Sequence, residues 1–436
     1  MEFNVRRSLV IDAVFSFSLK LSGTAILFAL TVYISRRMGA DALGYFSLFM
    51  SLLLPLSVLA RLGLDSNLLK LVSQPANESD GCALYLQSLS AVCIASILLS
   101  TLLLIVDVVM ESLAVSFKVM PLLSWLAVAL PFHGLLLLNV FYMRGRHWVV
   151  QAAIFENVVV YLFVLFGLLF SYELMGQQLS VAAVALGMVA ASLASFFYLG
   201  LSWERRGKAA LEAKSVPALK TRFSEALPML GTSLATMAFV TLDVFLLSFF
   251  VSYAEVGHYA AAAKLVAFTG FPLMAVISMV GARLSEAHAN GDQQQLKKIY
   301  MQSTALAVWV GLPILIVIAL FPVPLLEVFG KDFSEAKSVV YILILGQCVN
   351  LFMGPIGYML WMTGHASKLQ KVTLLSLTLL ILFSLVLVPF LGMEGAAIAV
   401  TIALIAKSAG CWWLVKNWLG FNPLYSFWKG TPYASS

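Results

Sequence analysis

Charged side chains that lie inside long apolar stretches are the residues of this 436-residue chain most able to do chemistry. Four are basic and two are acidic: Lys20, Arg61, Lys264, Lys407, Asp243 and Glu156. A charge at the centre of a bilayer costs about 3 kcal/mol, so such residues usually face a protein interior or a water-filled cavity. A cavity with an excess of positive charge suits a pyrophosphate, whose oxygens accept charge-assisted hydrogen bonds. The candidate pyrophosphate-binding residues are therefore Lys20, Lys264, Lys407 and Arg61, and the candidates for coupling to an ion are Asp243 and Glu156.

The stretches that carry these residues are long enough to cross a membrane. Hydrophobic residues make up 61% of the chain and charged residues 11%, against roughly half and a quarter in soluble domains. The first stretch, about Leu9 to Tyr33, is too long for a signal peptide and is expected to be retained. We therefore predict an all-α integral membrane protein with twelve transmembrane helices of roughly 20 or more residues each. Their cores are expected at 10–34, 43–72, 82–106, 119–143, 148–171, 179–202, 224–251, 255–283, 299–320, 337–362, 369–390 and 394–416.

The basic residues between these stretches predict the orientation in the membrane. If both termini are cytoplasmic, most of the 27 Lys and Arg fall on the inner side. The loops left outside then contain Arg36, Arg37, Lys118, Lys331 and Lys337. Cytoplasmic loops carry an excess of Lys and Arg, so this orientation is favoured. The net charge of +6 is thus an indicator of topology rather than of a nucleic-acid partner.

A polar connector divides the chain into two halves that resemble each other. We predict a six-helix lobe over 1–203, a cytoplasmic linker over 204–222, a second six-helix lobe over 223–418 and a cytoplasmic tail over 419–436. The segment 41–46, DALGYF, recurs as AEVGHY at 254–259. A duplication of this kind predicts two pseudo-symmetric lobes with a substrate site between them.

The depth of each charged residue leaves two interpretations open. Lys20 is about 16 Å into the first span and therefore near the midplane, where a cavity role is favoured over snorkelling. Arg61 lies closer to the inner interface and has Asp65 four residues on as an ion-pair partner, which favours a structural role. Lys407 is about as deep as Lys20, and either role fits it. Glu156 could bind an ion or simply hydrogen-bond a neighbouring helix.

Asp243 and Lys264 flank a short outer turn near 251–254. At helical rise both lie on the order of 12 to 15 Å below the turn, so the hairpin predicts that they meet. A permanent ion pair is one interpretation, in which loss of either partner leaves a buried charge. In the other, an incoming pyrophosphate takes Lys264 and frees Asp243 to bind a proton or a sodium ion.

Several loop motifs resemble those of a known family. They are the first outer loop 38–46, MGADALGYF, the end of the second span, Leu62-Gly63-Leu64, and the segment 389–397, PFLGMEGAA. With the twelve spans, they resemble the Wzx-type oligosaccharide flippases of the superfamily that also contains multidrug and toxin extruders. The resemblance implies movement of an undecaprenyl-pyrophosphate-linked oligosaccharide from the inner to the outer leaflet of a bacterial inner membrane by alternating access. It implies membrane lipid as a further partner, and polysaccharide polymerase and chain-length machinery as candidates.

Two other classes of function compete with a flippase. A cation-coupled multidrug exporter shares the fold, but its cation site favours a cluster of acids, and the first lobe offers only Glu156 deep in a span. A glycan polymerase or ligase needs a sizeable outer loop with polar catalytic residues, and the outer loops here are short. The sequence contains no nucleotide-binding glycine loop, metal motif or nucleophile with a base, which predicts a transporter without a cofactor rather than an enzyme.

Overall fold

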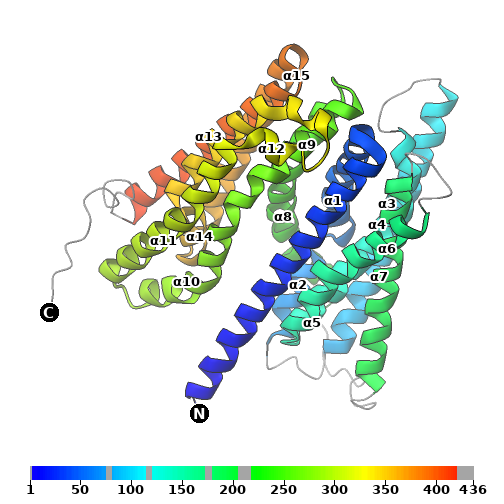
Figure 1. Ribbon diagram of the computed structural model, residues 1–436. Helices are drawn as coiled ribbons and strands as arrows, with labels where there is room; N and C mark the ends of the chain where they lie inside the picture. The colour runs from blue at the N-terminus through cyan, green and yellow to red at the C-terminus, as the bar shows by residue number, and fades with distance from the viewer. Residues whose placement is uncertain (1, 75–80, 114–119, 172–178, 205–217, 420–436) are drawn as a thin grey trace. The chain divides into compact units, whose positions relative to one another are not determined.

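The computed structural model describes residues 2–74, 81–113, 120–171, 179–204 and 218–419. The elements are α1 (Glu2–Arg61), α2 (Leu64–Val72), α3 (Gly81–Ser112), α4 (Met120–Gly145), α5 (Val149–Ile154), the π-helix η2 (Phe155–Val159), α6 (Val160–Ser171), α7 (Leu179–Glu204), α8 (Leu219–Ser248), α9 (Tyr253–Ala267), the 3-10 helix η4 (Phe268–Gly270), α10 (Phe271–Ala289), α11 (Gln293–Leu320), α12 (Pro322–Leu326), the 3-10 helix η5 (Lys331–Ala336), α13 (Lys337–Met353), α14 (Ile356–Met362) and α15 (Ala366–Trp418). These residues contain helices and no strand, which confirms the all-α prediction (Figure 1).

Within these ranges, ten helical segments are long and apolar enough to cross a membrane. Two of them, Ser18–Arg61 and Ala366–Trp418, are 44 and 53 residues long, far more than the roughly 20 that one span needs. Each contains one non-helical glycine, Gly39 (φ 88°) or Gly392 (φ 53°), at which the helix is kinked. Positive φ favours glycine because other residues clash there. The kinks fall at the predicted breaks between spans, while the count of twelve stays a prediction.

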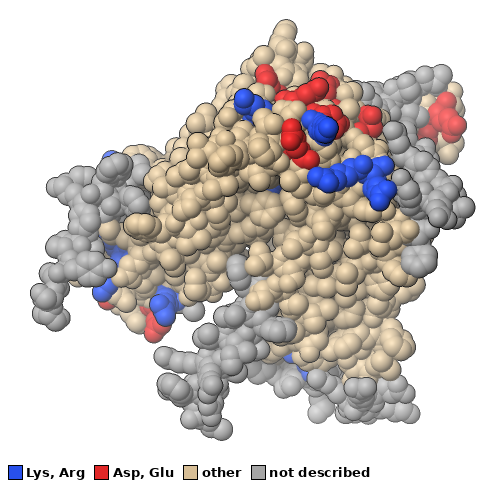
Figure 2. All heavy atoms as spheres, viewed as in Figure 1, with Lys and Arg blue, Asp and Glu red and all other residues tan. Residues whose placement is uncertain are grey.

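The outer surfaces of these helices suit a lipid environment. Large apolar side chains point away from the protein, among them Phe390 and Trp309, which are 84% and 80% exposed. In the face that Figure 2 shows, Lys, Arg, Asp and Glu gather at the helix ends, and the helix sides are almost free of charge. Apolar sides flanked by charged ends are what a bilayer requires of a multi-pass protein.

The chain forms two compact units, Met1–Thr241 and Leu242–Ser436. The division falls within α8, on the C-terminal side of the predicted linker. In the first unit α4 packs against α1, α2, α3 and α7, and α6 packs against α7. Its core includes Leu68, Tyr85, Leu138 and Tyr142. The predicted lobes and the symmetry between them remain predictions.

The second unit is built around α13. This helix packs against α9, α11 and α15, while α10 pairs with α11 and α14 with α15. The core near the ends of α10 and α11 includes Leu284, Tyr300, Met359 and Leu414. Close approaches are made by small residues, as at Gly346, where an added Cβ would lie 3.3 Å from the backbone of Thr401. Small residues at such contacts are typical of helix packing in membranes.

Candidate functional site

Lys20 lies on α1 within the first candidate span, and its side chain is exposed. It makes no ion pair with any residue that the structure describes. Three residues further along α1, Gly23 lies directly against η2, because an added Cβ would be 2.3 Å from the carbonyl oxygen of Asn157. Residues three apart lie on the same face of a helix, so Lys20 lies about one turn of α1 away from the point where α1 contacts η2. This placement is compatible with the predicted cavity role.

Glu156 belongs to that π-helix and is not an isolated charge. Its carboxylate pairs with the guanidinium of Arg144 from α4, and both side chains are about a quarter exposed. The side chain of Asn157 donates to the carbonyl of Ala153 at 3.0 Å. A π-turn within a helix commonly marks a functional position. This pair was not predicted from the sequence, although Arg144 at the end of one predicted span and Glu156 early in the next gave a signal.

Arg61 is buried and its guanidinium is already occupied. Its Nε donates to the carboxylate of Asp65 at 2.7 Å and its Nη1 to the hydroxyl of Ser57 at 3.1 Å. The predicted i,i+4 partner is therefore confirmed. The side chains of both charged residues are 6% exposed. This arrangement supports the structural interpretation of Arg61 over a role in binding substrate.

Asp243 does not pair with Lys264, and the predicted ion pair is wrong. The hydroxyl of Tyr259 donates instead to Oδ2 of Asp243 at 2.7 Å. Tyr259 and Lys264 are five residues apart on α9, so they point in different directions around the helix. The prediction rested on equal depth below the turn, and depth alone does not set the direction of a side chain. The other carboxylate oxygen, Oδ1, is buried and has no hydrogen-bond partner among the described residues.

Lys264 and Lys407 are both half-buried and both lie in the second unit. Lys264 is on α9 near the helix end, and Lys407 is in the part of α15 that follows the kink at Gly392. Helices α9 and α15 are in contact. Each unit thus contributes lysines from within its candidate spans, Lys20 in the first and Lys264 and Lys407 in the second.

Arg222, the most buried arginine in the described part of the chain, was not predicted from the sequence as a buried residue. Arg222 is 1% exposed and lies in the first turn of α8, at the position where the linker was expected to end. Its guanidinium donates to Asn67, to the Leu84 carbonyl, to Gln87 and to Ser88, at 2.7 to 3.2 Å. It therefore fastens α8 to α2 and α3 within the first unit. The partners of Arg222 are ordinary polar residues of the predicted spans. They lie 134 to 155 residues before Arg222, so the sequence alone could not match them to it.

With this geometry in place, the comparisons with known proteins identify the family. Residues 10–284, more than half of the chain, match the family model described as polysaccharide biosynthesis protein. The chain belongs to this family. A second family model, MatE, matches residues 228–386.

Similar proteins agree with this assignment. The chain is 22% identical to the "Probable low-salt glycan biosynthesis flippase Agl15" of Haloferax volcanii, over 89% of this chain and 79% of that protein. It superposes with a TM-score of 0.73 and 16% identity on an inward-facing multidrug resistance MATE transporter of the MOP superfamily, covering 96% and 99% of the two chains. For the lipid II flippase MurJ in an inward closed conformation the TM-score is 0.69, with 14% identity and coverage of 98% and 93%. The family and the multi-pass helical fold are thereby confirmed.

Proposed function

We propose that this protein flips an undecaprenyl-pyrophosphate-linked oligosaccharide from the inner to the outer leaflet of a bacterial inner membrane. The match of residues 10–284 to the polysaccharide biosynthesis family carries the proposal. The relative from Haloferax volcanii, named as a glycan biosynthesis flippase, supports the same class of cargo. In this proposal both termini are cytoplasmic and the two units alternate in access to the two sides.

The lysines within the candidate spans are the proposed binding groups for the pyrophosphate. Lys20, Lys264 and Lys407 bring three positive charges to positions where charge is costly and is kept for function. Ammonium groups bind phosphate oxygens through charge-assisted hydrogen bonds, which are about twice as strong as neutral ones. Arg61 stabilises the first unit through Asp65 in this account and does not contact the cargo.

Replacement of Lys20 tests the proposal in cells that lack their own flippase. Lys20→Gln is expected to abolish complementation and to leave lipid-linked repeat units on the inner leaflet, while the protein remains in the membrane. Lys20→Arg keeps the charge and is expected to retain most activity. Full complementation by the Gln variant would contradict the assignment. Glycan assembly that remains intact in the deletion strain, or units that are flipped but not joined, would contradict the function itself.

Asp243 is the proposed site of coupling to a proton or sodium gradient. One of its oxygens accepts the hydroxyl of Tyr259, and the other is buried without a partner in the described part of the chain. A buried oxygen of this kind is available to a cation. Asp243→Asn is expected to remove the dependence of flipping on the ion gradient in proteoliposomes, with the protein still folded. An unchanged ion dependence would assign coupling elsewhere, with Glu156 as the next candidate.

A cation-coupled multidrug exporter is the second candidate function. The superposition on a multidrug transporter and the MatE match over residues 228–386 favour it. An exporter would extrude cationic drugs, and its loss would sensitise cells without changing their surface glycan. Drug susceptibility measured in the deletion strain beside the lipid-linked intermediates therefore separates the two functions.

A further inference from the structure

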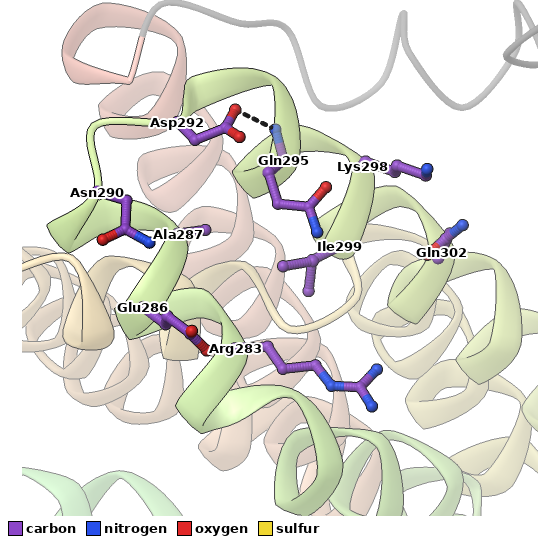
Figure 3. A pocket seen from close by; sticks show the side chains of 9 residues that line it. All are labelled: Arg283, Glu286, Ala287, Asn290, Asp292, Gln295, Lys298, Ile299 and Gln302. Atoms are coloured by element: carbon purple, nitrogen blue, oxygen red, sulfur yellow. Dashed lines mark hydrogen bonds between the residues drawn. The ribbon is translucent and has the colours of Figure 1, made fainter. Parts of the chain in front are cut away.

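A polar hollow lies at the hairpin between α10 and α11, next to the core that includes Leu284 and Tyr300. Its volume is about 580 Å³, and six of the side chains around it are Arg283, Glu286, Asp292, Gln295, Lys298 and Gln302 (Figure 3). All the residues that line it belong to the second unit. In Figure 3, Arg283 extends from α10, and Lys298 and Gln302 extend from α11 on the same side of the hairpin.

The hairpin places this hollow at the edge of the membrane. Helix α10 runs without a break to Ala289 and α11 begins at Gln293, so Arg283 and Glu286 lie in the last turns of α10. Lys298 and Gln302 follow within the first turns of α11. A hairpin that joins two candidate spans lies at one edge of the bilayer, where the headgroup layer extends about 5 to 8 Å beyond the hydrocarbon. A ligand that fills the hollow is therefore within reach from the lipid layer.

Charges of both signs line the hollow and do not neutralise each other. Arg283 and Glu286 are three residues apart on one helix face, but they form no ion pair. Lys298 also has no carboxylate partner among the described residues. Asp292 uses Oδ1 to accept the backbone N–H of Gln295 at 2.8 Å, which leaves Oδ2 available. Two cations and two carboxylates thus remain open to a ligand that carries both charges.

We propose that this hollow binds the headgroup of a zwitterionic aminophospholipid. The phosphate contacts Arg283 and Lys298, since guanidinium and ammonium groups are the common phosphate ligands. The primary ammonium contacts Glu286 and the free oxygen of Asp292, and Gln302 supplies a neutral hydrogen bond. An anionic lipid would leave the two carboxylates without a partner and in repulsion with the ligand. A quaternary amine lacks the N–H groups that the carboxylates accept. The proposal does not depend on the cargo of the transporter.

Retention of lipids by the purified full-length protein tests this site. The protein is placed in nanodiscs of phosphatidylcholine that contain phosphatidylethanolamine and phosphatidylglycerol in equal minor amounts, then extracted, and its bound lipids are counted by native mass spectrometry. Phosphatidylethanolamine is expected to be retained over the other two. Arg283→Gln and Glu286→Gln are each expected to lower this retention about tenfold, the loss of one charge-assisted contact. Lys297→Gln is the matched control, because Lys297 is next to Lys298 but does not line the hollow, and it is expected to retain the lipid.

Three results would overturn the proposal. Equal retention of phosphatidylglycerol, undiminished in Glu286→Gln, would make the hollow a simple anion site. If soluble phosphoethanolamine bound as tightly as the lipid, the ligand of the hollow need not come from the membrane, and the proposal of a lipid would fail. Retention of phosphatidylethanolamine that is the same in the two hollow variants and in Lys297→Gln would place the lipid elsewhere. Arg283 and Glu286 are exposed and Lys297 is partly exposed, so the three variants are expected to melt at the same temperature. Equal melting temperatures ensure that folding does not enter the comparison.

Discussion

Replacement of Arg222 by Met is expected to loosen α8 from the first unit. The guanidinium makes hydrogen bonds to four partners, Asn67, Leu84, Gln87 and Ser88, and is 1% exposed. Met fills a similar volume but donates nothing, so all four acceptors lose a donor. At about 0.6 kcal/mol per bond, the average in one membrane protein, the loss is about 2 kcal/mol. At about 1.5 kcal/mol per bond, the lower value for charged donors, it is about 6 kcal/mol.

The free energy of unfolding in mixed detergent micelles measures this loss, and hydrogen exchange locates it. Exchange is expected to rise first in α8 between Leu219 and Thr241, the part of the helix that belongs to the first unit. Arg222→Lys retains the charge but replaces the planar fork by a single ammonium, so an intermediate loss is expected. Lys220→Met is the matched control. Lys220 is exposed on the same turn, and its replacement is expected to change stability by less than about 0.5 kcal/mol.

A particular outcome would refute the reasoning about Arg222. If Arg222→Met unfolds at the same free energy as Lys220→Met and exchange in α8 is unchanged, the four hydrogen bonds do not hold this helix. A loss spread evenly over both units would also contradict the local role, because every partner of Arg222 lies in the first unit.

Further predictions concern the glycines that set the path of α1. Gly23→Ala is expected to destabilise the first unit by about 1 to 3 kcal/mol, because the new Cβ would lie 2.3 Å from the backbone oxygen of Asn157, which cannot turn away; unchanged unfolding would mean that α1 and η2 are not in contact. Gly39→Ala is expected to cost about 1 to 3 kcal/mol through backbone strain alone, since φ is 88° and ψ is 179° and nothing lies within 4 Å of an added Cβ. Gly200→Ala is the control, because Gly200 lies in a regular helix with open space around it, and its replacement is expected to be stabilising by up to about 1 kcal/mol. If Gly39→Ala and Gly200→Ala changed the free energy of unfolding equally, the backbone strain predicted at Gly39 would be contradicted.

The sequence was informative wherever a local rule determined the outcome. Long apolar stretches identified membrane helices, and the kinks at Gly39 and Gly392 fall at breaks that the sequence predicted between spans. The pair of Arg61 with Asp65 followed from the spacing of one helical turn. In these cases the interacting residues are only a few positions apart in the sequence, so the geometry of the helix backbone alone determines which side chains are in contact.

Contacts between helices could not be predicted in the same way. Asp243 accepts a hydrogen bond from Tyr259 and does not pair with Lys264. The rotation of α9 about its own axis determines which of its side chains points toward Asp243. Rotation is set by packing against other helices, and that packing is spread over the whole unit. Arg222 was assigned to a solvated linker for the same reason. Its partners, Asn67 and Ser88, are distant in sequence and look like any other polar residue within a span.

Movement of the cargo across a bilayer in proteoliposomes tests the central claim most directly. Purified protein is reconstituted with a fluorescent undecaprenyl-pyrophosphate-linked oligosaccharide on one leaflet, and a membrane-impermeant glycosidase reports arrival on the other. The account predicts release of the label that requires the protein, is lost in Lys20→Gln and is largely kept in Lys20→Arg. Label that stays protected with folded wild-type protein in the membrane, with or without an ion gradient, would contradict it.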